Sequence, residues 1–197
     1  MTPSHLLYLH GFRSSPRSMK AETTATYVRK HHPGLHWWCP QLPPSPNEAM
    51  AMVKTEVARW QAQTDFSAMA VMGSSLGGFY ATWIAERAAC RAVLLNPASE
   101  PARDLARYIG EQSTWQSPED TFYFKAEYVD ELRALHAGPL AEPGRYFAVI
   151  AKGDEVLDWR EMCARYEGAH IKLLEGGDHA LSDYDEHLVE AMAFLGL

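Results

Sequence analysis

The chain has 197 residues, of which 47% are hydrophobic and 22% charged, and its formal net charge at pH 7 is −7. The length favours one domain, and the composition excludes a disordered chain and a membrane protein. The acidic excess argues against nucleic-acid binding, which needs a basic face. The three cysteines form no CxxC pair, so we expect neither a disulfide framework nor a zinc site. With no basic leader and no apolar run of transmembrane length, we expect a cytoplasmic protein without a membrane span.

Short apolar runs without period-2 alternation recur along the chain. Such runs are typical of strands that are buried on both faces of a parallel sheet. Four runs are clear, at residues 6–9, 68–72, 92–95 and 147–151. Two weaker runs, at 35–39 and 170–174, complete the series.

Helical patterns lie between these runs. Between residues 46 and 63, an apolar stripe recurs at spacings of three and four, and Pro46 suits the first turn of such a helix. The segment from Asp183 repeats this spacing, and residues 76–89 are apolar on most sides, as in a buried helix. The alternation predicts an α/β fold, a doubly wound sheet of about six parallel strands with helices on both faces.

Residues 100–144 interrupt this alternation. They carry no strong strand signal, and they are far longer than the loops of about 2–6 residues that usually join strands and helices in α/β units. We therefore expect one domain over residues 1–197 with a cap-like, partly helical insertion at about 100–144. The insertion is rich in aromatic residues, which are Tyr108, Trp115, Phe122, Tyr123, Phe124 and Tyr128.

A GxSxG motif centred on Ser75 lies between a predicted strand and the predicted buried helix. A strand that turns sharply into a helix strains the central residue and crowds the residues two before and two after it, so both must be glycine. Gly73 and Gly77 meet this requirement for Ser75, whereas Ser74 has no such pair. The alternative is a glycine-rich turn with a bystander serine. The placement between strand and helix favours Ser75 as a nucleophile.

A serine nucleophile needs a base, and the base needs a carboxylate that orients it. His179 follows the last predicted strand and is the candidate base. Asp154 lies immediately beyond the strand at 147–151 and is the favoured carboxylate. Asp158, which is expected to start or cap the next helix, and Glu155 remain alternatives.

Acyl transfer also needs backbone N–H groups that stabilise an oxyanion. Leu76, which follows the candidate nucleophile, is one expected donor. Phe12, which follows the His10–Gly11 pair after the first strand, is the other. We expect the Phe12 ring to wall the substrate pocket. Arg13 lies beside this position and is a candidate for contact with an anionic group of the substrate; the alternative is a solvated side chain, as for Arg103 and Arg107. The alternative for His10 and Gly11 is an ordinary turn at a strand end.

The sequence indicates neither a metal nor a cofactor. His31, His32 and His36 lie at and beyond the end of a basic helix, where cations complement the helix dipole, so a metal site is not expected. The segment 73–78 is not a dinucleotide fingerprint, because Ser75 stands where that motif needs glycine, and no P-loop is present.

Five motifs stand out, at residues 8–12, 73–78, 95–98, 153–158 and 176–179. Together they resemble the α/β-hydrolase superfamily, and within it the small YqiA-type bacterial esterases. The resemblance implies a reduced form of that fold and a cofactor-free serine esterase. It further implies that Ser75, Asp154 and His179 form a catalytic triad, which hydrolyses a small-molecule acyl ester through an acyl-enzyme. The motifs are Tyr8-Leu9-His10-Gly11-Phe12, Gly73-Ser74-Ser75-Leu76-Gly77-Gly78, Leu95-Asn96-Pro97-Ala98, Gly153-Asp154-Glu155-Val156-Leu157-Asp158 and Gly176-Gly177-Asp178-His179.

Two other functions remain open at this point. An acyl-CoA thioesterase would use the same three residues and would place the CoA phosphates near Arg13 or Arg103. A non-catalytic binding protein with this fold is the other alternative, although such proteins usually lose a member of the triad. The sequence leaves the acyl chain, the leaving group and the oligomeric state open.

Overall fold

The computed structural model describes residues 2–197 and contains a six-stranded sheet in the order β2-β1-β3-β4-β7-β8. All neighbouring strands in it are parallel, which confirms the predicted sheet. The two weakest predictions correspond to the edge strands β2 and β8, which are less completely buried than the others. The strands are β1 (His5–Leu9), β2 (His36–Trp38), β3 (Met69–Ser74), β4 (Arg91–Leu95), β7 (Tyr146–Ala151) and β8 (His170–Leu174).

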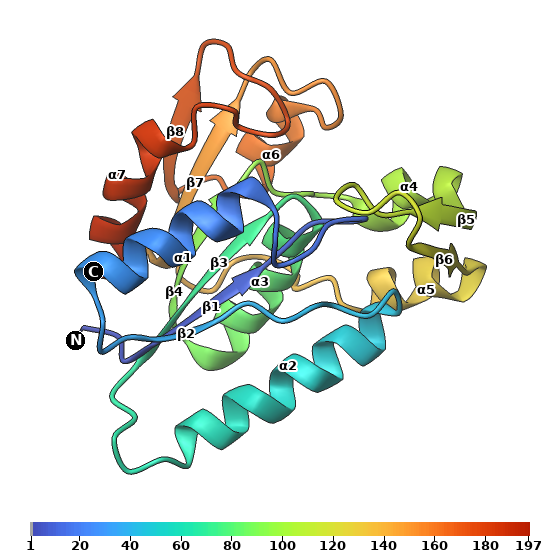
Figure 1. Cartoon of the computed structure of the whole chain (residues 1–197). Helices are drawn as coiled ribbons and strands as arrows, with labels where there is room; N and C mark the ends of the chain where they lie inside the picture. The colour runs from blue at the N-terminus through green and yellow to red at the C-terminus, as the bar shows by residue number, and fades with distance from the viewer. Residues whose placement is uncertain (1) are drawn as a thin grey trace.

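Helices cover both faces of this sheet (Figure 1). Helices α1 (Met19–His31) and α7 (Asp185–Leu195) pack on one face. Helices α2 (Pro46–Gln61), α3 (Leu76–Ala88) and α6 (Trp159–Arg165) lie on the other. Successive residues of a central strand contribute to opposite cores, so that these strands are apolar along most of their length.

The predicted helices begin where their sequence signals place them. Ser45 caps α2 by accepting the Glu48 N–H at 3.2 Å, and Pro46 occupies the first turn. The apolar stripe of α2 is buried against the sheet. Helix α3 is buried along most of its length, as its composition predicts.

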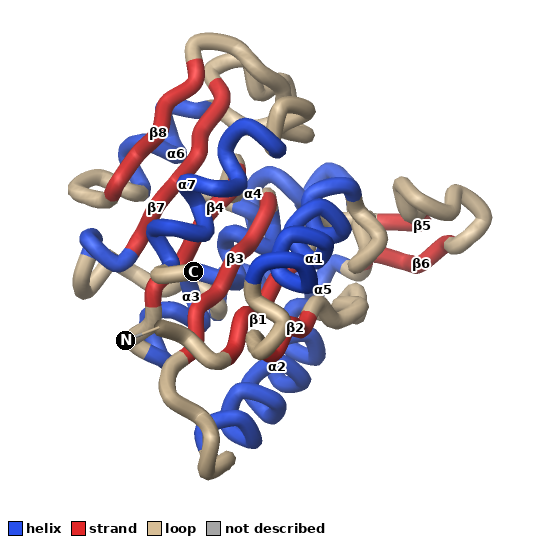
Figure 2. Tube along the Cα trace, turned by 60° about the vertical axis from the view of Figure 1, so that its left-hand side comes forward, coloured by secondary structure: helices blue, strands red, loops and turns tan. Residues whose placement is uncertain are grey.

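The chain between β4 and β7 forms the insertion. It is partly helical, as expected, but it also contains a two-stranded antiparallel sheet, β5–β6, which the sequence analysis did not predict. Strand β5 has no apolar side chain, and in β6 only Phe124 is fully buried, so neither strand carries the apolar run of the main sheet. This hairpin lies at the periphery of the molecule (Figure 2). The elements are α4 (Pro101–Leu105), η1 (Ala106–Tyr108), β5 (Gly110–Ser113), β6 (Thr121–Phe124), α5 (Ala126–Ala134) and η2 (Pro143–Arg145).

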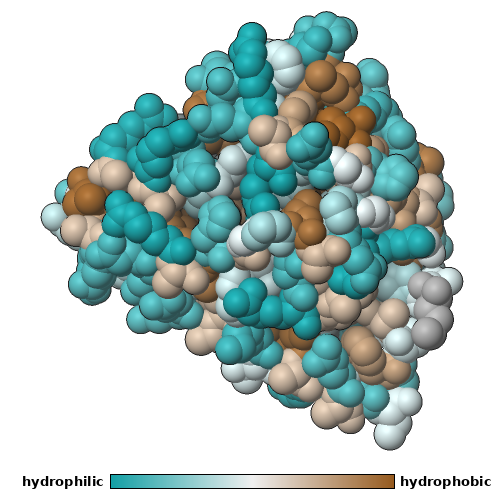
Figure 3. All heavy atoms as spheres, turned by 180° about the vertical axis from the view of Figure 1, so that it is seen from behind, coloured by the Kyte–Doolittle hydropathy of each residue, from teal (hydrophilic) through white to brown (hydrophobic). Residues whose placement is uncertain are grey.

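The surface is mixed in character. On the face seen in Figure 3, apolar residues form small patches among hydrophilic ones. Within residues 2–197, no helix has both the length and the apolar character that a membrane span requires. The exposed large hydrophobic side chains include Met19, Trp115 and Val156.

The start of α3 lies in van der Waals contact with the end of β1. A Cβ atom built on Gly77 would lie 1.9 Å from the carbonyl oxygen of Leu9, and one on Gly73 would lie 2.1 Å from the carbonyl oxygen of Gly77. No side chain fits at either position, because the atoms met are backbone atoms that cannot rotate away. The packing of α3 on the sheet therefore depends on these two glycines.

Gly77→Ala should destabilise the protein by about 3 kcal/mol or more, because helix and strand must separate to admit the methyl group. The matched control is Gly144→Ala, because a Cβ at Gly144 would meet no atom within 4 Å. We expect that control to change the free energy of unfolding by no more than about 1 kcal/mol. Urea unfolding of both variants measures the difference, and equal unfolding free energies would contradict the packing argument.

Candidate active site

Ser75 stands at the turn between β3 and α3 in a strained backbone conformation. Its φ of 56° and ψ of −122° are uncommon for a residue other than glycine. Neighbouring backbone holds the turn: the Ser75 N–H donates to the Leu95 carbonyl at 2.9 Å, and the Ser75 carbonyl accepts from the Ala98 N–H at 3.0 Å. Neither Gly73 nor Gly77 can accommodate a side chain, which confirms the requirement for glycine at both positions.

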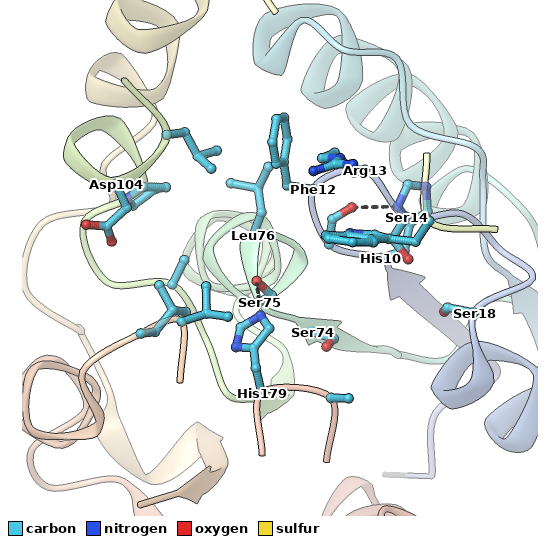
Figure 4. Close-up of a pocket in the computed structure, with 18 of the residues that line it drawn as sticks. His10, Phe12, Arg13, Ser14, Ser18, Ser74, Ser75, Leu76, Asp104 and His179 are labelled. Carbon is cyan, nitrogen blue, oxygen red and sulfur yellow. Dashed lines mark hydrogen bonds between the residues drawn. The ribbon is translucent and has the colours of Figure 1, made fainter. Parts of the chain in front are cut away.

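The imidazole of His179 lies between Ser75 and Asp154. Its Nε2 is 3.0 Å from the Ser75 hydroxyl oxygen, and its Nδ1 is 2.7 Å from Oδ2 of Asp154. With the proton on Nδ1, that N–H donates to the carboxylate, and the Ser75 hydroxyl donates to Nε2. The Ser75 hydroxyl and the His179 ring lie beside one another and point toward each other (Figure 4). Three loops, after β3, β7 and β8, thus bring the three predicted residues into one hydrogen-bonded row.

The Asp154 carboxylate is buried, with a side chain that is 0% exposed. Its second oxygen, Oδ1, accepts the backbone N–H groups of Val156 and Leu157, each at 2.8 Å. Both oxygens therefore have donors, as a buried charge requires. The two backbone bonds fix the carboxylate plane so that Oδ2 points at the imidazole.

The other carboxylates near this position have different partners. Asp158 caps α6 by accepting the Arg160 N–H at 2.9 Å, as expected. Glu155 accepts the backbone N–H of His179 at 3.0 Å and does not bind the ring. Of the alternatives considered from the sequence, only Asp154 contacts the imidazole.

The loop after β1 lies against Ser75. A Cβ built on Gly11 would be 3.2 Å from the Cβ of Ser75 and 3.7 Å from its hydroxyl oxygen, so a larger residue would crowd the serine. The backbone N–H groups of Phe12 and Leu76 have no acceptor among residues 2–197. These are the two N–H groups that the sequence analysis selected as oxyanion donors.

His10 anchors this loop. It is buried, its Nδ1–H donates to the Gly11 carbonyl at 3.0 Å, and its Nε2 accepts the Leu42 N–H at 3.1 Å. Burial lowers the pKa of His10, against the opposing effect of the Gly11 hydrogen bond. Burial therefore favours the neutral imidazole, which links the loop after β1 to the proline-rich segment at Leu42.

Ser75 and His179 open onto a cavity of about 480 Å³, a size that suits a small organic molecule. The sheet loops and the insertion both contribute to its walls. The apolar lining includes Phe12, Leu76, Leu105, Tyr108, Val156 and Leu157. The polar lining includes Arg13, Ser14, Ser18, Lys20 and Gln116. Phe12 packs against Tyr108, Phe122 and Phe124 of the insertion.

Arg13 connects the loop after β1 to the β5–β6 hairpin. Its Nε donates to the Ser113 carbonyl at 2.6 Å, and its Nη2 donates to the Ser113 hydroxyl at 3.0 Å. Its guanidinium carbon lies 4.2 Å from the centre of the Trp115 ring, and its own carbonyl accepts the Trp115 N–H at 2.8 Å. Arg103, by contrast, is paired with Glu161 and Asp104.

Two residues beside His179 were not selected from the sequence. Lys20 of α1 donates from Nζ to the Ala180 carbonyl, and burial lowers the pKa of Lys20 to about 8. Asn96, which follows β4, donates to the carbonyl of Asp178 at 2.9 Å. Asn96 belongs to a quoted motif but had no assigned role, and no local pattern around Lys20 indicates its contact.

His31, His32 and His36, which were considered from the sequence as possible metal ligands, are not part of a metal site among residues 2–197. No group of three or more His, Cys, Asp or Glu side chains there is arranged to hold a metal ion. His31, in the last turn of α1, stacks instead on Tyr27 with ring centres 4.4 Å apart.

Several solved structures are similar to this chain. Est1E from Butyrivibrio proteoclasticus, with ferulic acid bound, is 13% identical, with a TM-score of 0.70 over 98% of this chain and 86% of that chain. A structure from the metagenome-derived lipolytic enzymes LipS and LipT is 20% identical, with a TM-score of 0.71 and coverages of 98% and 93%. The esterase domain of a Rhodothermus marinus protein is 16% identical, with a TM-score of 0.66 and coverages of 98% and 85%. At these identities the likeness shows the fold, which is that of the α/β hydrolases.

The sequence also matches a family as a whole. The model of UPF0227, an uncharacterised protein family, matches residues 5–196, which is nearly the entire chain. This match spans the loops that carry Ser75, Asp154 and His179 and agrees with the resemblance noted from the motifs. The chain therefore belongs to the UPF0227 family, which is the YqiA family, within the α/β-hydrolase superfamily.

Proposed function

We propose that the protein is a serine esterase that hydrolyses carboxylic esters through an acyl-enzyme on Ser75. The observation that carries this proposal is the hydrogen-bonded row from Ser75 through His179 to Asp154, which opens onto a cavity. Each residue has the geometry that its role needs: a nucleophile, a base within hydrogen-bond reach, and a carboxylate that orients the base.

In the proposed acylation step, Ser75 Oγ attacks the ester carbonyl carbon while its proton passes to Nε2 of His179. Asp154 accepts the Nδ1–H bond throughout and stabilises the imidazolium that forms. The carbonyl oxygen becomes an oxyanion, which the N–H groups of Phe12 and Leu76 stabilise. The imidazolium then gives its proton to the leaving alkoxide oxygen, and the alcohol departs.

In the proposed deacylation step, a water molecule takes the place of the alcohol. His179 removes a proton from the water as it attacks the acyl carbon, and the same two N–H groups stabilise the second oxyanion. Collapse of that intermediate releases the carboxylic acid and returns the proton to Ser75. No metal or cofactor is needed to balance either step.

We further propose that the insertion at 100–144 is a cap of the single domain and that it shapes the substrate site. Its support is that Leu105, Tyr108 and Trp115 of the insertion line the same cavity as Ser75. In this arrangement the Phe12 ring walls the acyl pocket. Arg13, held by Ser113, presents its positive charge to the substrate at the same wall.

Ser75→Ala should reduce ester hydrolysis by about 10⁴-fold or more, because no other group in the site replaces the nucleophile. His179→Ala should cause a similar loss, and the double variant should be no worse than either single one, because the two residues act as a unit. Rates with a p-nitrophenyl ester test both points. Ser74→Ala, at the neighbouring serine, is the matched control and should keep most of the activity. Substantial turnover in folded Ser75→Ala would refute the assignment.

A fluorophosphonate probe separates an esterase from a binding protein with the same fold. The wild-type chain should be labelled at Ser75, because the probe reacts only with a serine activated by a base. Ser75→Ala should remain unlabelled, and His179→Ala should react far more slowly. Intact-mass measurement after incubation gives the result. A wild-type chain that stays unmodified would favour the non-catalytic alternative.

Asp154→Asn should reduce kcat by about 10³–10⁴-fold, because it removes the charge and favours the wrong imidazole tautomer. Asp158→Asn should leave turnover nearly normal, since asparagine also caps helices and the expected loss of stability is about 1 kcal/mol or less. The two variants make the same chemical change four positions apart, so each controls the other in one kinetic assay. Inactivity of Asp158→Asn alone would identify Asp158 as the acid.

A further inference from the structure

Asn96 occupies an unusual position at the end of β4. The residue is 0% exposed. Its backbone φ of 42° lies in the left-handed region, which asparagine tolerates better than most residues. A buried amide in a strained conformation persists only when surrounding contacts hold it. Those contacts are made by β7 and by residues 175–184, the loop that carries His179, which we call the His179 loop.

The side chain of Asn96 joins the His179 loop to the end of β7. Its Nδ2 donates to the carbonyl of Asp178 at 2.9 Å and to the carbonyl of His179 at 3.3 Å. Its Oδ1 accepts the N–H of Ala151 at 2.8 Å, at the end of β7 and three residues before Asp154. One amide thus joins the loop that carries the base to the strand that leads into the acid.

The backbone on either side of Asn96 holds the turn that carries Ser75. The Leu95 carbonyl accepts the Ser75 N–H at 2.9 Å, and the Ala98 N–H donates to the Ser75 carbonyl at 3.0 Å. The segment 95–98, which we call the β4 loop, therefore contacts the backbone of Ser75, that of Asp178 and His179, and that of Ala151 at the end of β7. The strand order explains this position, because β4 lies between β3 and β7.

We propose that Asn96 is a positioning residue, which holds the His179 loop and the end of β7 in register with Ser75. This inference rests on the proposed function. A primary amide suits the role, because it supplies a donor for the two carbonyls and an acceptor for the N–H at once. Aspartate keeps the acceptor but faces both carbonyls with a carboxylate, and glycine supplies neither group.

The His179 loop needs such a support. Two of its residues, Gly177 and Leu181, have positive φ, and it belongs to no helix or strand. Apart from Asn96, two side chains from outside the loop hold its backbone: Glu155 at the His179 N–H and Lys20 at the Ala180 carbonyl. Glu155 and Lys20 are both at least partly exposed, so Asn96 supplies the buried anchor among the three.

The test compares Asn96→Asp with the wild-type protein. Asn96→Asp retains the bond to Ala151 and tolerates the left-handed φ, so it disturbs mainly the His179 loop. We expect kcat to fall by about 10²-fold with KM nearly unchanged, as for a misplacement of the base by a fraction of an ångström to 1 Å. Asn96→Gly accepts the same φ and removes all three side-chain bonds, so its kcat should fall at least as far. This variant replaces Asn96→Asp in the test if Asn96→Asp does not fold.

Tyr166→Phe is the matched structural control. It removes a different buried hydrogen bond, between the Tyr166 hydroxyl and Thr82 at 2.8 Å, and Tyr166 directly follows α6, outside the three loops. We expect this variant to keep its kcat even if its unfolding midpoint falls as far as those of the Asn96 variants. If kcat of Asn96→Asp fell no further than that of Tyr166→Phe, Asn96 would have only a structural role.

A spectroscopic measurement distinguishes positioning from general loss of stability. The Nδ1–H of His179, bonded to Asp154, should give a far-downfield proton resonance, and Asp154→Asn should abolish it and thereby assign it. In folded Asn96→Asp that resonance should weaken or shift, whereas in Tyr166→Phe it should not. An unchanged resonance in Asn96→Asp would overturn the proposal.

A measurement on the wild-type protein tests the same point without any variant. The side-chain amide protons of Asn96 should be protected from solvent exchange and should shift when a fluorophosphonate occupies Ser75. Rapid exchange of these protons would overturn the positioning role. The proposed esterase function fails separately, through an active Ser75→Ala variant or a wild-type chain that the fluorophosphonate does not label, whatever the Asn96 variants do.

Discussion

The contact between the start of α3 and the end of β1 determines the geometry of the whole site. Gly77 lies so close to the Leu9 carbonyl that no side chain fits between helix and strand. This contact sets the Leu76 N–H, at the first turn of α3, beside the loop that carries the Phe12 N–H. It also forces the chain at Ser75 into the sharp turn that exposes its hydroxyl. One backbone approach therefore fixes the proposed nucleophile and both proposed oxyanion donors together.

The parallel topology explains how residues distant in sequence meet at this turn. Every strand of the sheet runs in the same direction, so the loops after β1, β3, β4, β7 and β8 emerge at one edge. The strand order then decides which loops are neighbours. Because β4 separates β3 from β7, the β4 loop lies between the Ser75 turn and the Asp154 loop, which allows Asn96 to contact backbone on both sides. The insertion follows the same loop, and its residues Leu105, Tyr108 and Trp115 line the cavity at this edge.

The sequence predicts the parts of this arrangement that have a local cause. Burial on both faces makes the central strands continuously apolar, and the crowding at Ser75 requires glycines at fixed positions, so both leave a pattern in the sequence. Asp154 and His179 were identifiable because each lies in the loop that follows a predicted strand. Their mutual hydrogen bonds agree with that placement, while their catalytic roles remain proposals.

The features that sequence reasoning missed depend on long-range contacts. The β5–β6 hairpin is held by Arg13 and Phe12, residues about a hundred positions earlier, and β5 itself has no apolar residue. Lys20 and Asn96 bond to backbone carbonyls of the His179 loop, and a backbone carbonyl leaves no trace in the identity of its residue. A side chain that acts on distant backbone is therefore invisible to pattern analysis, even within a motif that is recognised.

The hydrogen-bonded row is buried at its acid end and more exposed at its serine end, and this difference bears on the proposed chemistry. The Asp154 side chain is 0% exposed and that of His179 is 21% exposed, so the row is closed to solvent at the acid and open at the serine. Exclusion of water at the acid strengthens the interaction between carboxylate and imidazolium, because the local dielectric is low there. The water that deacylation consumes must reach Nε2 from the cavity, since the Nδ1 side is occupied by Asp154. In the proposed reaction, the walls of that cavity, which include residues of the insertion, would therefore control the entry of both the ester and the water.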